Sequence, residues 1–433
     1  MSDKYAYNLI PGLRFPDFIC DKEWKELLFG KLFTFLPNNT LSRADLKEGE
    51  GDGDVYNVHY GDVLIKLNAY TDIQQGRLPA IKNVADISKY QNARLQDGDI
   101  VIADTAEDET VGKCTEIFNT QETIVVSGLH TIPCRPRIKF AQAFLGYYMN
   151  SSSFHNRLRH IMQGVKVTSI SKTALQNIYL TFPESFEEQQ KIADCLSSID
   201  SYISSINEKI EQLKAHKKSL MQKLFPQNGE IIPEYRFPKF KSAGIWEEKK
   251  LGEFLFEHKM KNDGHCEVFS VSVSKGVVNQ VDYLGRSFSA SDTSKYKLVK
   301  PFDVIYTKSP TGSFPYGIIK QSFVDHNVVV SPLYGVFSPL NKYIGYIIHS
   351  FFESPERTNN FLAPIVKKGA KNTIQISNDT FLSQTVCFPS DLKEQCEIAK
   401  CLFSISEMIN HYTAKTDSLG LQKKGMMQRL FPN

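Results

Sequence analysis

The chain repeats itself, and this repeat constrains the fold more strongly than any single motif. Arg14-Phe15-Pro16 precedes Trp24, Arg236-Phe237-Pro238 precedes Trp246, and each Trp lies ten residues after its Arg. The equal spacing predicts two copies of one unit, each with its own core. The two Trp residues, the only ones in the chain, are expected to anchor those cores.

The two copies close with matched motifs at a constant offset of 206 residues. Phe182-Pro183 returns as Phe388-Pro389, and Leu224-Phe225-Pro226 returns as Leu430-Phe431-Pro432. The loops within the two copies differ. The repeat therefore predicts one scaffold that carries two different surfaces.

Apolar residues at alternating steps of four and three predict two long helices, over 185–226 and 391–433. The first seam is Ile192, Leu196, Ile199, Ile203, Ile206, Ile210, Leu213, Lys217, Leu220 and Leu224. The second seam is Ile398, Leu402, Ile405, Ile409, Tyr412, Thr416, Leu419, Lys423, Met426 and Leu430. A seam of this period needs a partner helix, so we expect the two helices to pair as an antiparallel coiled coil.

One lysine interrupts each seam at the same heptad position. Lys217 and Lys423 could act as polar residues that set the register of the coiled coil. They could also extend their charged ends to solvent, and we favour this second interpretation.

The remaining segments, 1–184 and 227–390, are expected to form two modules made mainly of strands. Asp99-Ile100-Val101-Ile102 predicts a buried strand after a turn, and Asp303-Val304-Ile305-Tyr306 predicts its counterpart. Leu145-Gly146-Tyr147-Tyr148 and Ile344-Gly345-Tyr346-Ile347 predict short helices. The expected fold class is α+β, with two tandem mixed α/β modules separated by two long helices.

Charge is distributed unevenly along the chain. Residues 1–180 hold 20 Lys and Arg against 21 Asp and Glu, whereas residues 231–390 hold 19 against 14. A mildly basic second module is compatible with a polyanionic partner. The N-terminus lacks an apolar leader and no long apolar run occurs, so we expect a cytoplasmic protein with reduced cysteines.

Familiar catalytic and metal-binding motifs are missing from the sequence. The eight Cys residues form no C-x-x-C pair, and Val111-Gly112-Lys113-Cys114 lacks the first Gly and the hydroxyl of a phosphate-binding loop. The Asn/Asp-Pro-Pro-aromatic motif of an amino-methyltransferase is also missing. We expect a recognition component without chemistry or a cofactor of its own.

The ordered set of repeated motifs resembles the specificity (S) subunits of Type I restriction–modification enzymes. The resemblance is carried by the Arg-Phe-Pro…Trp starts, the Gly-Asp-Ile-Val-Ile strand at 98–102 with its counterpart, the Phe-Pro…Glu-Gln…Ile-Ala helix starts and the Leu-Phe-Pro helix ends. Members of this family carry two target-recognition domains, separated by two long helices. The implied domains are 1–184 and 227–390, with spacer helices over 185–226 and 391–433.

The resemblance also implies function and partners. Each recognition domain would read one half of a bipartite, asymmetric site in double-stranded DNA, and the helices would set the spacing. Modification (methyltransferase) subunits would dock on the chain, and restriction subunits would join that core. S-adenosylmethionine, ATP and Mg are then expected on the partner subunits.

Two loops centred on glycine are the first candidates for DNA contact, because glycine allows close backbone approach and lysine neutralises phosphate. In the second module these residues are Lys367, Lys368 and Lys371 around Gly369, and in the first they are Gln163 and Lys166 around Gly164. An ordinary solvated loop is the alternative.

Two further groups are candidates for DNA contact. Lys308, Thr311, Ser313 and Tyr316 follow a predicted strand of the second module, where the first module has the acidic segment 104–110. The basic residues of the first module are Arg135, Arg137, Lys139, Arg157 and Arg159. Arg157 and Arg159 could instead belong to the solvated face of a helix.

Two other functions remain open from the sequence. The nearly neutral first module would also suit a bivalent scaffold that binds proteins without DNA specificity. A nuclease or methylase with unrecognised chemistry is the third class, and such a protein should act on DNA alone.

Overall fold

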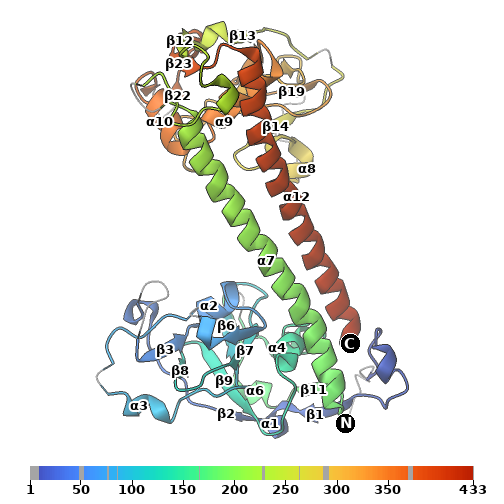
Figure 1. Ribbon diagram of the computed structural model, residues 1–433. Helices are drawn as coiled ribbons and strands as arrows, with labels where there is room; N and C mark the ends of the chain where they lie inside the picture. The colour runs from blue at the N-terminus through green and yellow to red at the C-terminus, as the bar shows by residue number, and fades with distance from the viewer. Residues whose placement is uncertain are drawn as a thin grey trace. The chain divides into compact units, whose positions relative to one another are not determined.

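A computed structural model describes residues 9–47, 53–75, 78–84, 86–164, 166–226, 230–262, 264–285, 292–368 and 374–432. The chain divides into two compact units (Figure 1). The first unit comprises Met1–Ile206 together with Ala414–Asn433, and the second comprises Asn207–Thr413. Among the described residues, no helix is long and apolar enough to cross a membrane.

The first unit contains eleven described strands, six short helices and part of two long ones. Its strands are β1 (Lys25–Leu28), β2 (Phe33–Phe35), β3 (Val55–Val58), β4 (Tyr70–Asp72), β5 (Ile100–Ala103), β6 (Thr105–Ala106), β7 (Cys114–Phe118), β8 (Ile124–Ser127), β9 (Thr131–Pro136), β10 (Thr168–Ser169) and β11 (Tyr179–Phe182). Its short helices are α1 (Phe29–Leu32), α2 (Tyr60–Ile65), α3 (Ser88–Gln91), α4 (Phe144–Met149), α5 (Ser152–Leu158) and α6 (Lys172–Leu175). The long helices are α7 (Phe186–Leu224) and α12 (Leu392–Leu430).

The second unit repeats much of this order in its described residues. Its strands are β12 (Glu247–Lys250), β13 (Leu255–Glu257), β14 (Phe269–Ser272), β15 (Gly276–Asn279), β16 (Lys297–Val299), β17 (Val304–Tyr306), β18 (Ile319–Gln321), β19 (Val328–Val330), β20 (Gly335–Pro339), β21 (Lys367–Lys368), β22 (Ile374–Gln375) and β23 (Thr385–Phe388). Its short helices are α8 (Gln280–Leu284), α9 (Lys342–Phe351), α10 (Pro355–Leu362) and α11 (Asn378–Leu382).

The central sheets of the two units share a strand order. The first is β2-β9-β5-β7-β4 and the second is β13-β20-β17-β18, so the second lacks a strand at the place of β4 among its described residues. Strands β5 and β17 are fully buried, as the sequence predicted. The short helices predicted after them are α4 and α9. In each unit a separate antiparallel pair, β1–β11 or β12–β23, leads into a long helix.

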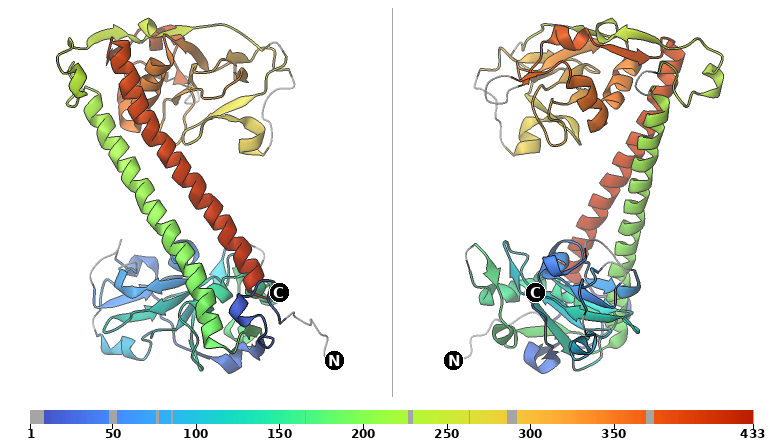
Figure 2. Two further views of the ribbon diagram at one scale, coloured as in Figure 1. Left: turned by 45° about the vertical axis from the view of Figure 1, so that its right-hand side comes forward. Right: turned by 90° about the vertical axis from the view of Figure 1, so that its left-hand side faces the viewer.

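Within each unit, segments of α7 and α12 run antiparallel (Figure 2). In the first unit, Lys415 donates a hydrogen bond to Tyr202, and Lys423 lies 2.6 Å from Asp200. In the second, the end of α7 and the beginning of α12 share one apolar core. All twenty predicted seam positions are buried or half-buried, which confirms the helical register.

The preference for solvent-directed seam lysines is wrong. The Lys423 ammonium pairs with Asp200 and lies over the ring of Tyr147, and its side chain is 20% exposed. Lys217 pairs with Glu353 at 2.6 Å. Each lysine therefore ties its helix to a carboxylate within its unit, a partner that heptad spacing alone does not identify.

A buried Arg–Glu–Trp cluster fixes the start of α7. Arg14 donates two hydrogen bonds of 2.7 Å to the two oxygens of Glu188, and the Trp24 indole donates to the same carboxylate at 3.2 Å. Glu188 is 1% exposed and lies in the first turn of the helix, where the helix dipole also favours a negative charge. The repeated motifs are therefore parts of one interaction.

The same cluster recurs at the start of α12. Arg236 donates to Glu394 at 2.6 and 2.7 Å, and Trp246 donates at 3.3 Å. Both Trp side chains are 2% exposed, which confirms them as core residues.

Replacing Glu188 by Gln should destabilise the first unit by about 3 kcal/mol, because the buried Arg14 then loses its counter-charge. Urea unfolding monitored by tryptophan fluorescence measures this loss. Glu184→Gln is the matched control, since the Lys25–Glu184 pair is solvent-exposed, and it should leave the unfolding curve unchanged. Equal effects of the two variants would contradict the structural role of the cluster.

Glu116 is a second buried carboxylate of the first unit. It lies on β7, is 2% exposed, and accepts a hydrogen bond from the Gly146 backbone N–H at 2.9 Å. Burial raises the pKa of Glu116 to about 8 despite this donor and the Ala143 N–H. Gln321 occupies the equivalent sheet position of the second unit, because Ile100 pairs with Glu116 as Val304 pairs with Gln321.

This pKa predicts a pH-dependent stability. A carboxyl whose pKa is raised by folding stabilises the folded state below its unfolded pKa, and this contribution is lost as pH rises through the folded pKa. The free energy of unfolding of the first unit should fall by on the order of 3–5 kcal/mol between about pH 5 and pH 9. Glu116→Gln should flatten this dependence, which Tm measured across that range would reveal. A wild-type Tm independent of pH would contradict the assignment.

Candidate nucleic-acid interface

Two of the candidate DNA residues of the second unit, Lys308 and Lys367, lie at one end of its central sheet, which we call the hairpin end. Lys308 follows β17, and Lys367 lies on β21, which pairs with β22 as a short hairpin. Lys308, Lys367 and Gln375 line one open hollow of about 860 Å³. Two loops separated by more than fifty residues in the sequence thus contribute ammonium groups to one surface.

Lys308 is held in an unusual position. Its φ of +56° lies in the left-handed region, and the side chain is half-buried. Burial lowers its pKa, and the nearby Lys297 lowers it further. A partly desolvated ammonium is stabilised when an anion such as a phosphate pairs with it.

Hydroxyl and amide groups complete the hollow. Ser309, Ser377 and Thr380 line it together with the lysines, and these side chains can donate or accept hydrogen bonds. Leu333 also lines the hollow and is 76% exposed. The combination suits a polyanion that presents apolar edges as well as charge.

The other predicted residues of the 308–316 loop lie in a tight turn. Thr311 and Ser313 are exposed, and Thr311 pairs with Phe314 through two backbone hydrogen bonds of 3.0 and 2.9 Å. Tyr316 packs against the core, and its carbonyl accepts a hydrogen bond from Tyr306. Tyr316 is therefore less available for stacking than the sequence suggested.

The glycine-centred loop of the second unit is described only in part. The backbone of Lys368 belongs to β21. Gly369 and Lys371 lie outside the described residues.

The first unit carries an equivalent hairpin end with different chemistry. Gln163 pairs with Ser169, Gly164 has a φ of +111°, and Lys166 is exposed. Asp104 directly precedes β6 and occupies the position equivalent to Lys308 of the second unit. The first unit therefore presents a carboxylate where the second presents an ammonium.

The basic group predicted in the first module does not form one surface. Arg135 and Arg137 lie at the end of β9, whereas the hairpin end adjoins the beginning of that strand, since Thr131 pairs with Ala103. Arg135 donates to both oxygens of the buried Asp99, at 2.8 and 2.7 Å. Arg137 and Lys139 are exposed, the latter over the ring of Phe186.

Arg157 requires a correction. Its side chain is 3% exposed and donates to Glu26 at 3.0 Å, to the carbonyl of Tyr179 and to Thr181. It holds α5 against the β1–β11 pair and is neither a surface contact nor part of a solvated face. Arg159, two residues later, is exposed and lies 3.5 Å from Glu109.

An aromatic pair at the hairpin end of the first unit, His130 and Tyr60, was not among the residues predicted from the sequence. His130 has a φ of +56° and is exposed, and its ring lies 5.4 Å from that of Tyr60. It also approaches Asp104, at 3.6 Å. Its position could have been found by aligning the two repeats, in which Val125-Val126-Ser127-Gly128-Leu129 matches Val329-Val330-Ser331-Pro332-Leu333 at an offset of 204 residues.

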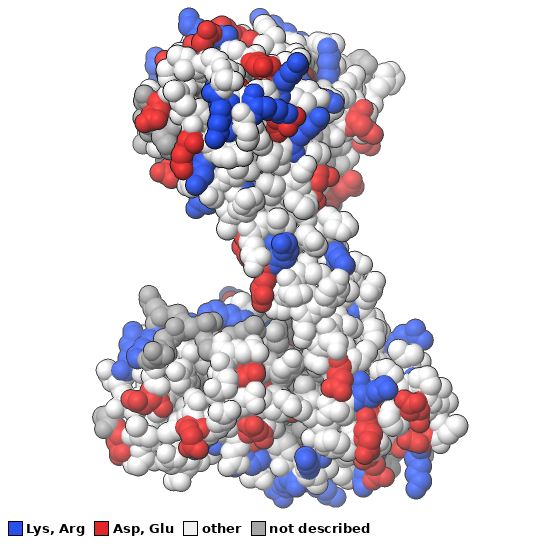
Figure 3. Space-filling model, in the orientation of Figure 1, with Lys and Arg blue, Asp and Glu red and all other residues white. Residues whose placement is uncertain are grey.

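Figure 3 shows Lys and Arg gathered on the face of the second unit that this view presents. The described part of the chain contains no group of three or more His, Cys, Asp and Glu side chains that could hold a metal ion.

Comparison with known proteins finds similarity to one family. Residues 21–215 match the family model of the Type I restriction modification DNA specificity domain. The chain is 25% identical over 386 residues to a putative type I restriction enzyme MjaX specificity subunit of Methanocaldococcus jannaschii, with 85% of this chain and 82% of that protein covered. It is 24% identical over 307 residues to the EcoKI specificity subunit of Escherichia coli, covering 66% and 64% respectively.

A solved structure shares the fold. The crystal structure of a Type I restriction–modification S subunit from M. genitalium superposes with a TM-score of 0.60 at 14% identity. The superposition covers 98% of this chain and 99% of that one.

Proposed function

Since the chain belongs to the specificity-subunit family of Type I restriction–modification enzymes, we propose that it reads a bipartite, asymmetric DNA site with one unit per half-site. The observation that carries this proposal is the pair of equivalent hairpin ends. Each has an antiparallel backbone pairing at the equivalent place, Gln163 with Ser169 in the first unit and β21 with β22 in the second, but one presents Asp104 and the other Lys308. Two different surfaces on one scaffold read two different half-sites.

Each hairpin end supplies two kinds of contact. Lysines of the second unit neutralise phosphates and position the unit, while side chains in the hollow approach base edges in the major groove. In the first unit, Gln163 and His130 are suited to hydrogen bonding with bases, and Asp104 can accept from cytosine N4. The first unit depends less on phosphate contacts than the second.

The helices α7 and α12 set the distance between the half-sites. Their seams are mainly apolar, and each contains one lysine that pairs with a carboxylate, which favours one register. Modification subunits dock on this chain and supply the methylation chemistry with S-adenosylmethionine. Restriction subunits, with ATP and Mg, join that assembly, and the present chain is the non-catalytic reader.

Methylation mapping tests the proposal directly. The chain is combined with its modification subunit, and methylated positions are located across a genome by single-molecule sequencing. Two short specific blocks around a fixed run of unspecified bases are expected. An assembled complex that methylates without a split motif would instead favour a bivalent protein-binding scaffold.

The double variant Lys308→Ala/Lys367→Ala should weaken DNA binding and reduce its salt dependence. Each lysine that neutralises a phosphate contributes about one unit to the slope of log K against log salt, so the slope should fall by about two. Fluorescence anisotropy of the assembled complex with its DNA site, at several salt concentrations, gives the slope.

Lys241→Ala is the matched control, because Lys241 is exposed in the same unit but lies outside the hollow. It should leave the slope unchanged. A double variant with the wild-type slope would exclude phosphate contacts by Lys308 and Lys367.

Deleting one heptad from α7 and the matching heptad from α12 should shorten the unspecified spacer. Seven residues correspond to about 10 Å of helix, or roughly three base pairs. Both half-site sequences should stay the same in the methylation map. An altered half-site with an unchanged spacer would contradict the role of the helices.

A further inference from the structure

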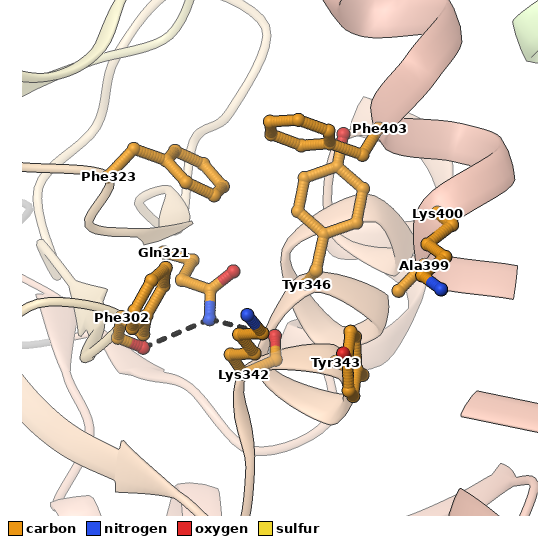
Figure 4. Close-up of a pocket in the computed structure, with 9 residues that line it drawn as sticks. All are labelled: Phe302, Gln321, Phe323, Lys342, Tyr343, Tyr346, Ala399, Lys400 and Phe403. Atoms are coloured by element: carbon orange, nitrogen blue, oxygen red, sulfur yellow. Dashed lines mark hydrogen bonds between the residues drawn. The ribbon is translucent and has the colours of Figure 1, made fainter. Parts of the chain in front are cut away.

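The second unit has an aromatic pocket between α9, α12 and the loops beside β17 and β18 (Figure 4). It encloses about 260 Å³, room for one large side chain. Its walls include Phe302, Phe323 and Phe403, which are 41%, 48% and 41% exposed. Three half-exposed Phe side chains around one hollow form an apolar surface that requires an explanation.

One wall of the pocket is held in a strained backbone conformation. Phe302 has a φ of +69°, which bulky residues rarely adopt. In the first unit the same position is Gly98, with a φ of +86°. The two turns are equivalent, because the N–H groups of Asp99 and Asp303 each donate to the carbonyl three residues earlier, at 3.0 and 3.1 Å. This backbone conformation favours glycine, so an exposed Phe held in it points to a function for its ring.

The first unit fills the equivalent space with its own chain. Tyr147 and Tyr346 correspond, since each hydroxyl meets the long helix at matched positions, Asp200 and Ser406. In the first unit, Tyr70 of β4 lies against Tyr147, with ring centroids 6.2 Å apart.

Tyr70 also lies 6.2 Å from Phe118, the counterpart of Phe323 in the sheet register. The described residues of the second unit include no strand at the place of β4, and β18 forms the sheet edge. The aromatic pocket is thus the space that Tyr70 occupies in the other copy.

The residues that line the pocket differ in charge and polarity from those at the equivalent positions of the first unit. At the offset of 206 residues, Phe403 replaces Ser197 and Lys400 replaces Asp194. Lys342, whose ammonium lies 5.8 Å from the centre of the Phe302 ring, adds a second cation. Among the described residues neither lysine has a carboxylate within ion-pair distance, although Glu397, which pairs with Lys239 at 2.7 Å, also interacts electrostatically with Lys400. The rim therefore suits a partner that carries negative charge.

We propose that this pocket is a docking site for a modification subunit, which inserts one large apolar side chain flanked by carboxylates. The inference rests on the proposed function and adds an asymmetric contact, present once per chain. Protein is favoured over DNA as the occupant because Phe302 precedes β17 whereas Lys308 follows it. The pocket therefore lies at the opposite end of that strand from the hairpin end.

The test replaces two walls by the residues of the first unit, in the double variant Phe302→Gly/Phe403→Ser. Association with the modification subunit, measured by isothermal titration calorimetry on the full chain, should weaken by about 10- to 100-fold. The Tm of Phe302→Gly alone should not fall, because glycine relieves the left-handed strain. Ile245→Ser, at an apolar residue that is 61% exposed outside the pocket, should leave association unchanged.

Photocrosslinking identifies the occupant. The variant Phe403→p-benzoylphenylalanine, irradiated in the assembled complex with DNA, should crosslink to the modification subunit. The matched variant at Ser197 should do so much less. Crosslinking to DNA or to a second copy of the chain, or no crosslinking at all, would overturn the inference.

Failure of the proposed function and failure of the docking inference give different experimental results. A wild-type chain that never assembles with modification subunits would overturn the proposed function, and the inference with it. A wild-type chain that assembles and yields a split motif, while the double variant associates with equal affinity, would overturn the inference alone.

Discussion

A buried carboxylate at the first turn of each long helix holds this protein together. Glu188 and Glu394 are each 1% exposed, and an isolated charge at such a position would be prohibitively unfavourable. Each is stabilised only because an Arg from the start of the repeat and the following Trp converge on it. One interaction thus joins the entry segment, the β1–β11 or β12–β23 pair, and the helix. The direction in which each helix leaves its module depends on this junction.

The long helices and the central strands could be predicted from the sequence because their patterns occur in both copies of the repeat. The seam from Ile192 to Leu224 has a period that only a helix satisfies, and the run Ile100–Ile102 returns as Val304–Tyr306. The burial of individual charged side chains could not be predicted. Arg157 and Lys423 look like surface residues in the sequence, yet they are held inside the first unit by ion pairs with Glu26 and Asp200, which are distant in the sequence. Heptad and propensity patterns describe local periodicity and carry no information about such distant partners.

The candidate site was predictable to the same limited extent. Lys308 and Lys367 were each identified from local features, but their convergence on one hollow depends on how β17 and the β21–β22 hairpin meet. His130 could not be identified from local features. Only the alignment of the two repeats, in which Leu129 matches Leu333, places its loop at the hairpin end, and its counterpart in the second unit is not basic. The aromatic pocket was beyond sequence analysis, because it results from a strand that one copy has and the described part of the other lacks.

The first unit includes residues from both ends of the chain. Leu430 and Phe431 belong to its core, with Phe431 against Trp24, and the carbonyl of Arg429 accepts a hydrogen bond from Leu13. During synthesis, the core around Trp24 therefore cannot close until residues 414–433 have been made. A ribosome carrying the first 206 residues holds an incomplete unit, whereas the second unit is internal and can be completed earlier. Trp24 and its neighbours therefore stay exposed until residues 414–433 have been made, so the nascent first unit is the part of the described protein that most needs protection from aggregation.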